Sequence, residues 1–166
     1  GKRGKPALAQ PLCRSGLRFN VAHSADLAVY AFSYEHEVGV DVEAVRALPD
    51  ADDITARFFS QREQAAYGAL DSCHRQRGFF TCWTRKEAYI KALGDGLYHP
   101  LDGFDVTLAP GEPARILRVA DTPDANATAS GELTLEWEGL QSSLTGELNI
   151  IEANIDIASN PEATRM

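Results

Sequence analysis

The sequence has no long apolar run and no sign of an export signal. Of its 166 residues 44% are apolar, but none of them form a run of about eighteen or more, the length that spans a bilayer. The basic start, 1–10, is not followed by the apolar core of a signal peptide. We therefore expect one compact cytoplasmic domain that does not contact a membrane.

Cysteine is scarce, and its spacing does not suit a metal site. Cys13, Cys73 and Cys82 are an odd number of thiols, and no two of them have the close spacing of metal ligands. We therefore expect reduced thiols in a cytosolic protein rather than a disulfide framework, and we assign these residues no function.

Basic residues are few in the last third of the chain. The net charge is −8, and residues 101–166 carry 3 Lys and Arg against 12 Asp and Glu, whereas residues 1–100 carry 13 against 12. The first 18 residues hold five basic side chains and no acid, which suits either an anionic ligand or a solvated tail. An acidic total without a basic, aromatic-rich stripe argues against nucleic acid as the partner.

The hydrophobic pattern predicts strands, then helices, then strands, which is typical of an α+β fold. Three short runs within 17–43 are rich in Val, Phe and Tyr. Ser60 and Glu63 form the pattern of a capping box that begins a helix, and a longer helix is expected over 71–93, ended by Gly94 and Gly96. Its buried stripe is predicted to contain Phe79, Trp83, Ile90 and Leu93.

The last third is predicted to contain further strands. Their expected positions are 103–108, 114–119, 132–139 and 148–157. Residues 121–131 have the composition of a loop, and 159–166 look like a frayed tail.

Asp41 and Glu43 are the first pair of residues with possible chemistry. Side chains alternate along a strand, so both carboxylates lie on one face while Val40 and Val42 face the core. Neighbouring carboxylates repel unless a proton or cation neutralises one, and hard oxygen ligands suit Mg²⁺. Two acids that merely keep an exposed strand soluble are the alternative, and the spacing alone favours it.

Glu87 and Lys91 lie four residues apart, on one face of the predicted long helix. Such a pair is most often a surface salt bridge worth about 0.3–0.5 kcal/mol. Two further residues could meet a phosphate: His23, where a strand gives way to a turn, and Lys5, beside Pro6. A structural histidine and a surface lysine are the alternatives.

The order and spacing of these residues resemble the Sfp-type 4′-phosphopantetheinyl transferases. The motifs that carry the resemblance are Gly4-Lys5-Pro6, Phe19-Asn20 to His23-Ser24, Gly39-Val40-Asp41-Val42-Glu43, Arg57-Phe58-Phe59-Ser60, Trp83 to Lys91 and Gly94-Asp95-Gly96-Leu97. They cover about two thirds of the chain, 4–108, and the strand and long-helix motifs together are highly specific.

The resemblance implies Mg²⁺-dependent transfer of the phosphopantetheine arm of coenzyme A to a serine of an acyl or peptidyl carrier protein, with release of adenosine 3′,5′-bisphosphate. Asp41, Glu43 and Glu87 would then bind Mg²⁺, and Glu87 and Lys91 would be catalytic. Coenzyme A phosphates would meet Lys5, His23, Lys86 and Lys91, with packing as the alternative role for Lys86. Glu63 also matches a recurring family glutamate.

The sequence departs from the family in three places. Ala22 stands where a serine often precedes the histidine, which predicts weaker coenzyme A binding. The C-terminal strand pattern of 148–160 fits only loosely. Family members have two similar halves, and this chain is expected to lack much of the first: 1–16 would be its end or a linker, 17–158 the transferase domain and 159–166 a tail.

Several interpretations of this short chain remain open. A second chain, or the missing half, would complete the coenzyme cleft. A non-catalytic module that binds coenzyme A or a carrier protein is one alternative function. Another Mg²⁺-dependent phosphoryl or nucleotidyl enzyme is the other. For carrier docking, the candidates are Arg57, Arg62, Arg75, Arg77 and Arg85.

Overall fold

The computed structural model describes residues 5–94 and 99–119, together with the backbone of four short segments, 127–128, 137–139, 142–144 and 146–153. The helices are α1 (Ala51–Phe58), α2 (Gln61–Gly68) and α3 (Ser72–Leu93). The strands are β1 (Leu17–Ser24), β2 (Leu27–Tyr34), β3 (Glu37–Ala44), β4 (Phe104–Val106), β5 (Ile116–Val119), β6 (Ala127–Thr128), β7 (Trp137–Gly139), β8 (Ser142–Leu144) and β9 (Gly146–Ala153). Short 3₁₀ turns span Leu12–Arg14 and Leu101–Gly103.

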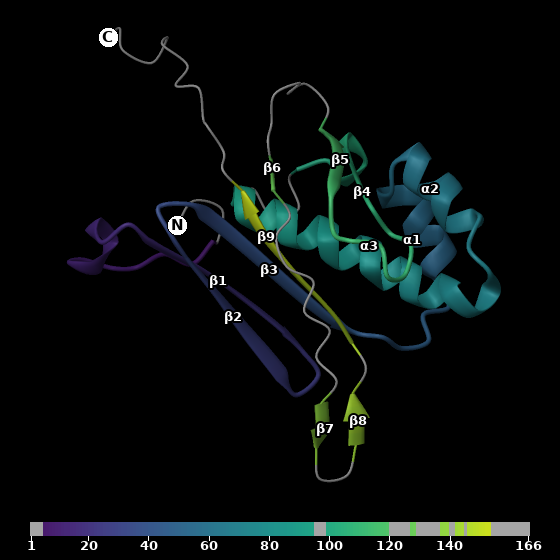
Figure 1. Ribbon diagram of the computed structural model, residues 1–166, viewed down its shortest axis with the longest axis horizontal. Coiled ribbons are helices and arrows are strands. Elements are labelled where there is room, and N and C mark those ends of the chain that lie inside the picture. Colours follow the sequence, from purple (N-terminus) through teal and green to yellow (C-terminus); the bar gives the residue numbers. More distant parts are fainter. Residues whose placement is uncertain are drawn as a thin grey trace, which may run out of the picture.

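The predicted α+β class is confirmed, with strands before and after a run of three helices (Figure 1). β3 pairs antiparallel with β9, which pairs in turn with β6, while β1–β2, β4–β5 and β7–β8 are antiparallel pairs. The helices gather on one side of β3 and β9, and the β1–β2 hairpin lies on the other (Figure 1). Among the described residues, no helix is long and apolar enough to cross a membrane.

The predicted helix signals before and after the core helix are confirmed. Ser60 accepts a hydrogen bond from the Glu63 amide, and the Glu63 side chain accepts one from the Ser60 amide, so the capping box begins α2. Gly94 ends α3 with a φ of +76°, a conformation that glycine adopts without strain. Gly96 lies outside the described residues.

Some elements differ from the expectation. Helix α1 was not predicted, although Asp52 and Asp53 in its first turn and Arg57 in its last complement the helix dipole. Ala127 and Thr128 form a short strand within a predicted loop. Much of the predicted strand 132–139 and all of the predicted tail 159–166 lie outside the described residues.

Strand β3 is covered on both faces, which explains why it is buried for most of its length. Val38, Val40 and Val42 pack with Ala22 and Ala31 of the hairpin in a small apolar cluster. The opposite face meets α3, whose apolar side chains form a larger core with α1, α2 and β4. The predicted alternation of β3 is therefore correct, but its acidic face lies against a helix and not in open solvent.

The closest approach of β3 to α3 occurs at Gly39. A Cβ at this position would overlap the carbonyl oxygen of Ala88 and the amide nitrogen of Ala92. Both alanines are fully buried, and their small side chains permit the same close approach. Glycine is therefore required at residue 39 because the helix backbone occupies the space of any side chain.

We expect Gly39→Ala to lower the free energy of unfolding by about 3 kcal/mol, because two backbones must move apart to admit the methyl group. Gly68→Ala is the matched control, since a Cβ there meets nothing within 4 Å. Urea unfolding of both variants checks the difference. Equal stability of the two variants would contradict the packing described.

Candidate functional site

Asp41 lies in the middle of β3 with its carboxylate directed toward α3. Its side chain is 7% exposed, and its Oδ1 accepts a hydrogen bond of 2.6 Å from Lys91 Nζ. The other oxygen, Oδ2, is buried and has no hydrogen-bond partner among the described residues. A buried carboxylate oxygen without a donor is costly, so this atom is suited to a ligand that the protein alone does not provide.

Glu87 contributes a second carboxylate from α3. The residue is partly buried, and its Oε1 is the other buried carboxylate oxygen that lacks a partner within the described part of the chain. The spacing predicted a Glu87–Lys91 contact, but the lysine donates instead to Asp41 across the strand–helix boundary. The pair of predicted helix residues therefore belongs to the same site as the predicted strand residues.

Glu43 is the third carboxylate, and Ser24 holds it. Ser24 Oγ donates to Glu43 Oε2 at 3.0 Å and accepts from the Ala44 amide at 3.0 Å. Asn20 makes a similar link, because its Oδ1 accepts from the Val40 amide at 3.1 Å. These two β1 side chains attach the hairpin to β3, a role that the sequence analysis did not identify for either residue.

Burial and neighbouring charges raise the pKa of two of the three carboxylates. Burial raises the pKa of Asp41 to about 6 and Glu43 adds to the increase, although Lys91 opposes it. Burial also raises the pKa of Glu87 to about 7, and the charges of Asp41 and Glu43 add to the effect. The site therefore holds more negative charge than its one lysine balances, which favours binding of a proton or a cation.

The donor set suits a hard cation such as Mg²⁺, although the side chains do not form a finished cage. Among the described residues, no three carboxylate, histidine or cysteine side chains are arranged so that they could hold a metal ion as they stand. The two unpartnered oxygens of Asp41 and Glu87 are nevertheless the kind of ligand that Mg²⁺ takes while it keeps several waters. Their chemistry fits the ion that the sequence predicts.

Lys5 and His23, expected at the coenzyme phosphates, lie in different surroundings. Lys5 Nζ is 2.6 Å from Glu37 Oε2 and 2.7 Å from the carbonyl oxygen of Ala92, at the C-terminal end of α3. His23 is exposed on β1, next to the serine that holds Glu43. Ala22, before it, is packed in the small apolar cluster. Both phosphate contacts stay predictions.

Lys86 has the contacts of the packing alternative. Its ammonium is fully buried, forms an ion pair with Glu63 Oε2 at 2.8 Å, and donates to the carbonyl oxygens of Leu101 and Phe104 at 2.6 and 2.7 Å. These three contacts bury the ammonium inside the protein. The coenzyme contact expected of Lys86 therefore stays a prediction that its buried position does not support.

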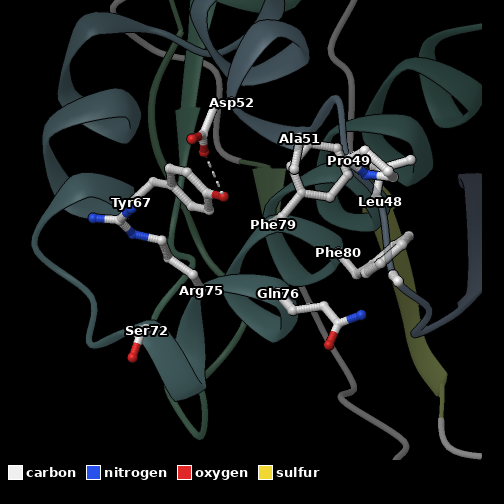
Figure 2. A pocket seen from close by; sticks show the side chains of 11 residues that line it. Leu48, Pro49, Ala51, Asp52, Tyr67, Ser72, Arg75, Gln76, Phe79 and Phe80 are labelled. Carbon is white, nitrogen blue, oxygen red and sulfur yellow. Dashed lines mark hydrogen bonds between the residues drawn. The ribbon is translucent and has the colours of Figure 1, made fainter.

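A cavity of about 350 Å³ opens between α1 and the first turns of α3. Figure 2 shows Phe79 and Phe80 with Leu48 on one side, and on the other the hydrogen bond of 3.1 Å from Tyr67 to Asp52. Phe80 precedes Glu87 by seven residues, which is two helical turns or about 10 Å. The cavity and the carboxylates therefore lie along the same face of α3.

The raised pKa values predict how stability changes with pH in the absence of divalent ions. The folded state binds more protons than the unfolded state between about pH 4 and pH 7, so the free energy of unfolding contributed by Asp41 and Glu87 falls as the pH rises through this range. The free energy of unfolding lost through Asp41 over this range is on the order of 3 kcal/mol. We expect Glu87→Gln to reduce the decline.

Urea unfolding at several pH values measures this slope, with Asp53→Asn on the exposed side of α1 as the control. A Glu87→Gln slope equal to that of the control would contradict the electrostatic coupling.

Comparison with known proteins places this site in a family. The model of the 4′-phosphopantetheinyl transferase superfamily matches residues 37–144, which include β3 and α3. The protein HetI of Nostoc sp., named as a 4′-phosphopantetheinyl transferase, is 41% identical over 114 residues, 69% of this chain and 48% of HetI. The Synechocystis sp. protein slr0495 is 30% identical over 162 residues, 93% of this chain and 64% of that protein.

A solved structure, the holo-[acyl-carrier-protein] synthase of Thermotoga maritima, aligns with 70% of this chain and 63% of that one at 19% identity and a TM-score of 0.45. The chain spans about half the length of HetI and just under two thirds of the length of slr0495. The family match covers well over half of this chain and includes all three carboxylates of the site. The chain belongs to the 4′-phosphopantetheinyl transferase superfamily.

Proposed function

We propose that this chain transfers the 4′-phosphopantetheine arm of coenzyme A to a serine of an apo acyl or peptidyl carrier protein in the cytoplasm, and releases adenosine 3′,5′-bisphosphate. Family membership supports the reaction class. The observation that carries the proposal is the meeting of Asp41, Glu87 and Lys91 at the β3–α3 contact, with two buried carboxylate oxygens unpartnered among the described residues.

Mg²⁺ would be held by Asp41, Glu43 and Glu87, together with the coenzyme pyrophosphate. When bound, the ion neutralises charge on the phosphate oxygens and replaces the protons that the raised pKa values favour. Ser24 would keep Glu43 oriented through its hydrogen bond. The unbalanced negative charge of the three carboxylates therefore favours the binding of a cation.

The chain's own residues would move the proton and stabilise the leaving charge. The serine oxygen forms a bond to the β-phosphorus of the coenzyme, the pyrophosphate bond breaks, and the serine proton passes to Glu87, directly or through a water. A carboxylate close to the attacking hydroxyl is the kind of group that serves as a general base. Lys91, a partly exposed cation beside Asp41, would stabilise charge on the departing phosphate.

Besides the metal ion and Lys91, His23 would contact the coenzyme A phosphates, since it is exposed beside Ser24. Lys5 would contribute through its position at the C-terminal end of α3, although it already binds Glu37 and the Ala92 carbonyl. Residues supplied by a second chain, or by the remainder of a longer protein, would complete the cleft.

The carrier protein would dock beside α1 and α3, where Arg57 and Arg75 would meet its acidic surface. Arg57 is exposed on α1, and Arg75 lies at the rim of the cavity over the Tyr67 ring. Arg62 is also exposed, at 72% of its side chain. Arg85 was wrongly counted among the docking candidates: it is buried and donates to Thr107 and to the Glu112 carbonyl.

Incubation with coenzyme A, Mg²⁺ and an apo carrier protein should add one phosphopantetheine to the carrier serine, which intact mass measures. Glu87→Gln should lower the rate at least a hundredfold, because it removes both the ligand charge and the base. Asp53→Asn is the control. Binding of coenzyme A or carrier without a mass increase would favour a binding module, and turnover of nucleotides alone would favour another phosphoryl-transfer enzyme.

Addition of Mg²⁺ near pH 7.5 should raise the melting temperature of the wild type more than that of Glu87→Gln. The ion binds the folded state and relieves the repulsion among the three carboxylates. Differential scanning fluorimetry with and without EDTA measures the shift. An equal shift in both proteins would rule out Glu87 as a ligand.

Reversal of two docking charges, in Arg57→Glu with Arg75→Glu, should raise the KM for an acidic carrier about tenfold and leave kcat within about twofold, because the change affects encounter and not chemistry. Arg115→Glu, on an exposed residue between β4 and β5, is the control. Carrier kinetics equal to those of this control would remove the assigned docking surface.

A further inference from the structure

The buried pair Glu63 and Lys86 connects α3 to three other elements. Their side chains are 2% and 0% exposed, and the two charged groups are 2.8 Å apart. Glu63 also accepts hydrogen bonds of 2.8 Å from the amides of Ser60, at the start of α2, and Val106, in β4. Lys86 donates to the carbonyl oxygens of Leu101 and Phe104. One ion pair thus ties α3 to α2, to β4 and to the turn before β4.

Stability alone is a weak explanation for this pair. Removing two charges from water costs free energy that their attraction repays only in part, and apolar side chains of similar volume often replace such pairs without loss of stability. Lys86 donates to two backbone carbonyls, and its ammonium lies 4.2 Å from the centre of the Phe104 ring. These contacts fix the position of Lys86 relative to β4 and the turn before it.

Lys86 is the residue immediately before Glu87. Neighbouring side chains on an α-helix point about 100° apart, so Lys86 faces α2 and β4 when Glu87 faces β3. A rotation of α3 that carried Glu87 away from Asp41 would pull the Lys86 ammonium from the Glu63 carboxylate and from its two carbonyl acceptors. The direction in which Lys86 points therefore determines the direction in which Glu87 points.

We propose that Glu63 and Lys86 are positioning residues, which set the rotation of α3 about its axis and so place Glu87 and Lys91 against Asp41. Neither residue touches substrate in this role. The functional consequence rests on the proposed transferase activity, whereas the effect on the β3–α3 contact does not.

The test separates position from stability. In Glu63→Gln the Lys86 charge is buried without its partner, so the melting temperature should fall. Adding Lys86→Met removes the unpaired charge, so the double variant should recover much of that fall. Its Mn²⁺ dissociation constant, with Mn²⁺ as the probe for the metal site, should nevertheless stay about ten- to a hundredfold above wild type, the usual effect of losing a group that orients a ligand.

Amide chemical shifts of ¹⁵N-labelled protein give a readout independent of metal and of activity. The positioning role predicts changed shifts for Gly39, Asp41, Ala88 and Lys91 in the double variant. Asp105→Asn is the matched control: it removes a β4 acid that is 1% exposed and paired with Arg118 of β5, and it should leave these four shifts as in the wild type.

Wild-type shifts at these four amides in the double variant would overturn the proposal, as would a Mn²⁺ affinity that recovers together with the melting temperature. Absence of Mn²⁺ binding and of phosphopantetheine transfer in the wild type would count against the proposed function. The chemical shifts would still decide whether the ion pair positions α3.

Discussion

The close contact between β3 and α3 is the constraint on which the site depends. Gly39 admits the backbone of Ala88 and Ala92 at a distance that no larger residue allows. This approach brings a carboxylate two residues further along the strand within 2.6 Å of Lys91, a residue fifty positions away in the chain. A larger side chain at residue 39 would force the strand and the helix apart and disturb that hydrogen bond.

The two clusters of buried charge on α3 differ in how fully they are satisfied. Lys86 and Glu63 balance each other, and the polar atoms around them are hydrogen-bonded. On the other side of the helix one lysine stands against three carboxylates, and burial has raised the pKa of two of them. The balanced cluster suits a structural role, and the unbalanced one suits a site that gains a cation and phosphates when it works.

Local patterns predicted much of the fold because they act over a few residues. The capping box of Ser60 and Glu63, the glycine that ends α3 and the alternation of β3 depend on neighbours in the chain, and all three are confirmed. Helix α1 was missed because eight residues with an acidic start carry too weak a pattern on their own. Taken separately, Asp41 with Glu43 and Glu87 with Lys91 were each more typical of a solvated surface. Only the combination of the two pairs in a family pattern indicated a site.

The sequence by itself determined which residue types were available, three carboxylates and a lysine in family order, and that they lie on a strand and a helix. The tertiary structure decided their partners. It paired Lys91 with Asp41 and not with Glu87, and it paired Glu43 with Ser24. It also buried Lys86, which was predicted to contact coenzyme A, and Arg85, which was predicted to contact a carrier protein. Hydrogen bonds between distant segments, and the burial of their side chains, depend on how closely those segments pack. The periodicity of a sequence gives no information about that distance.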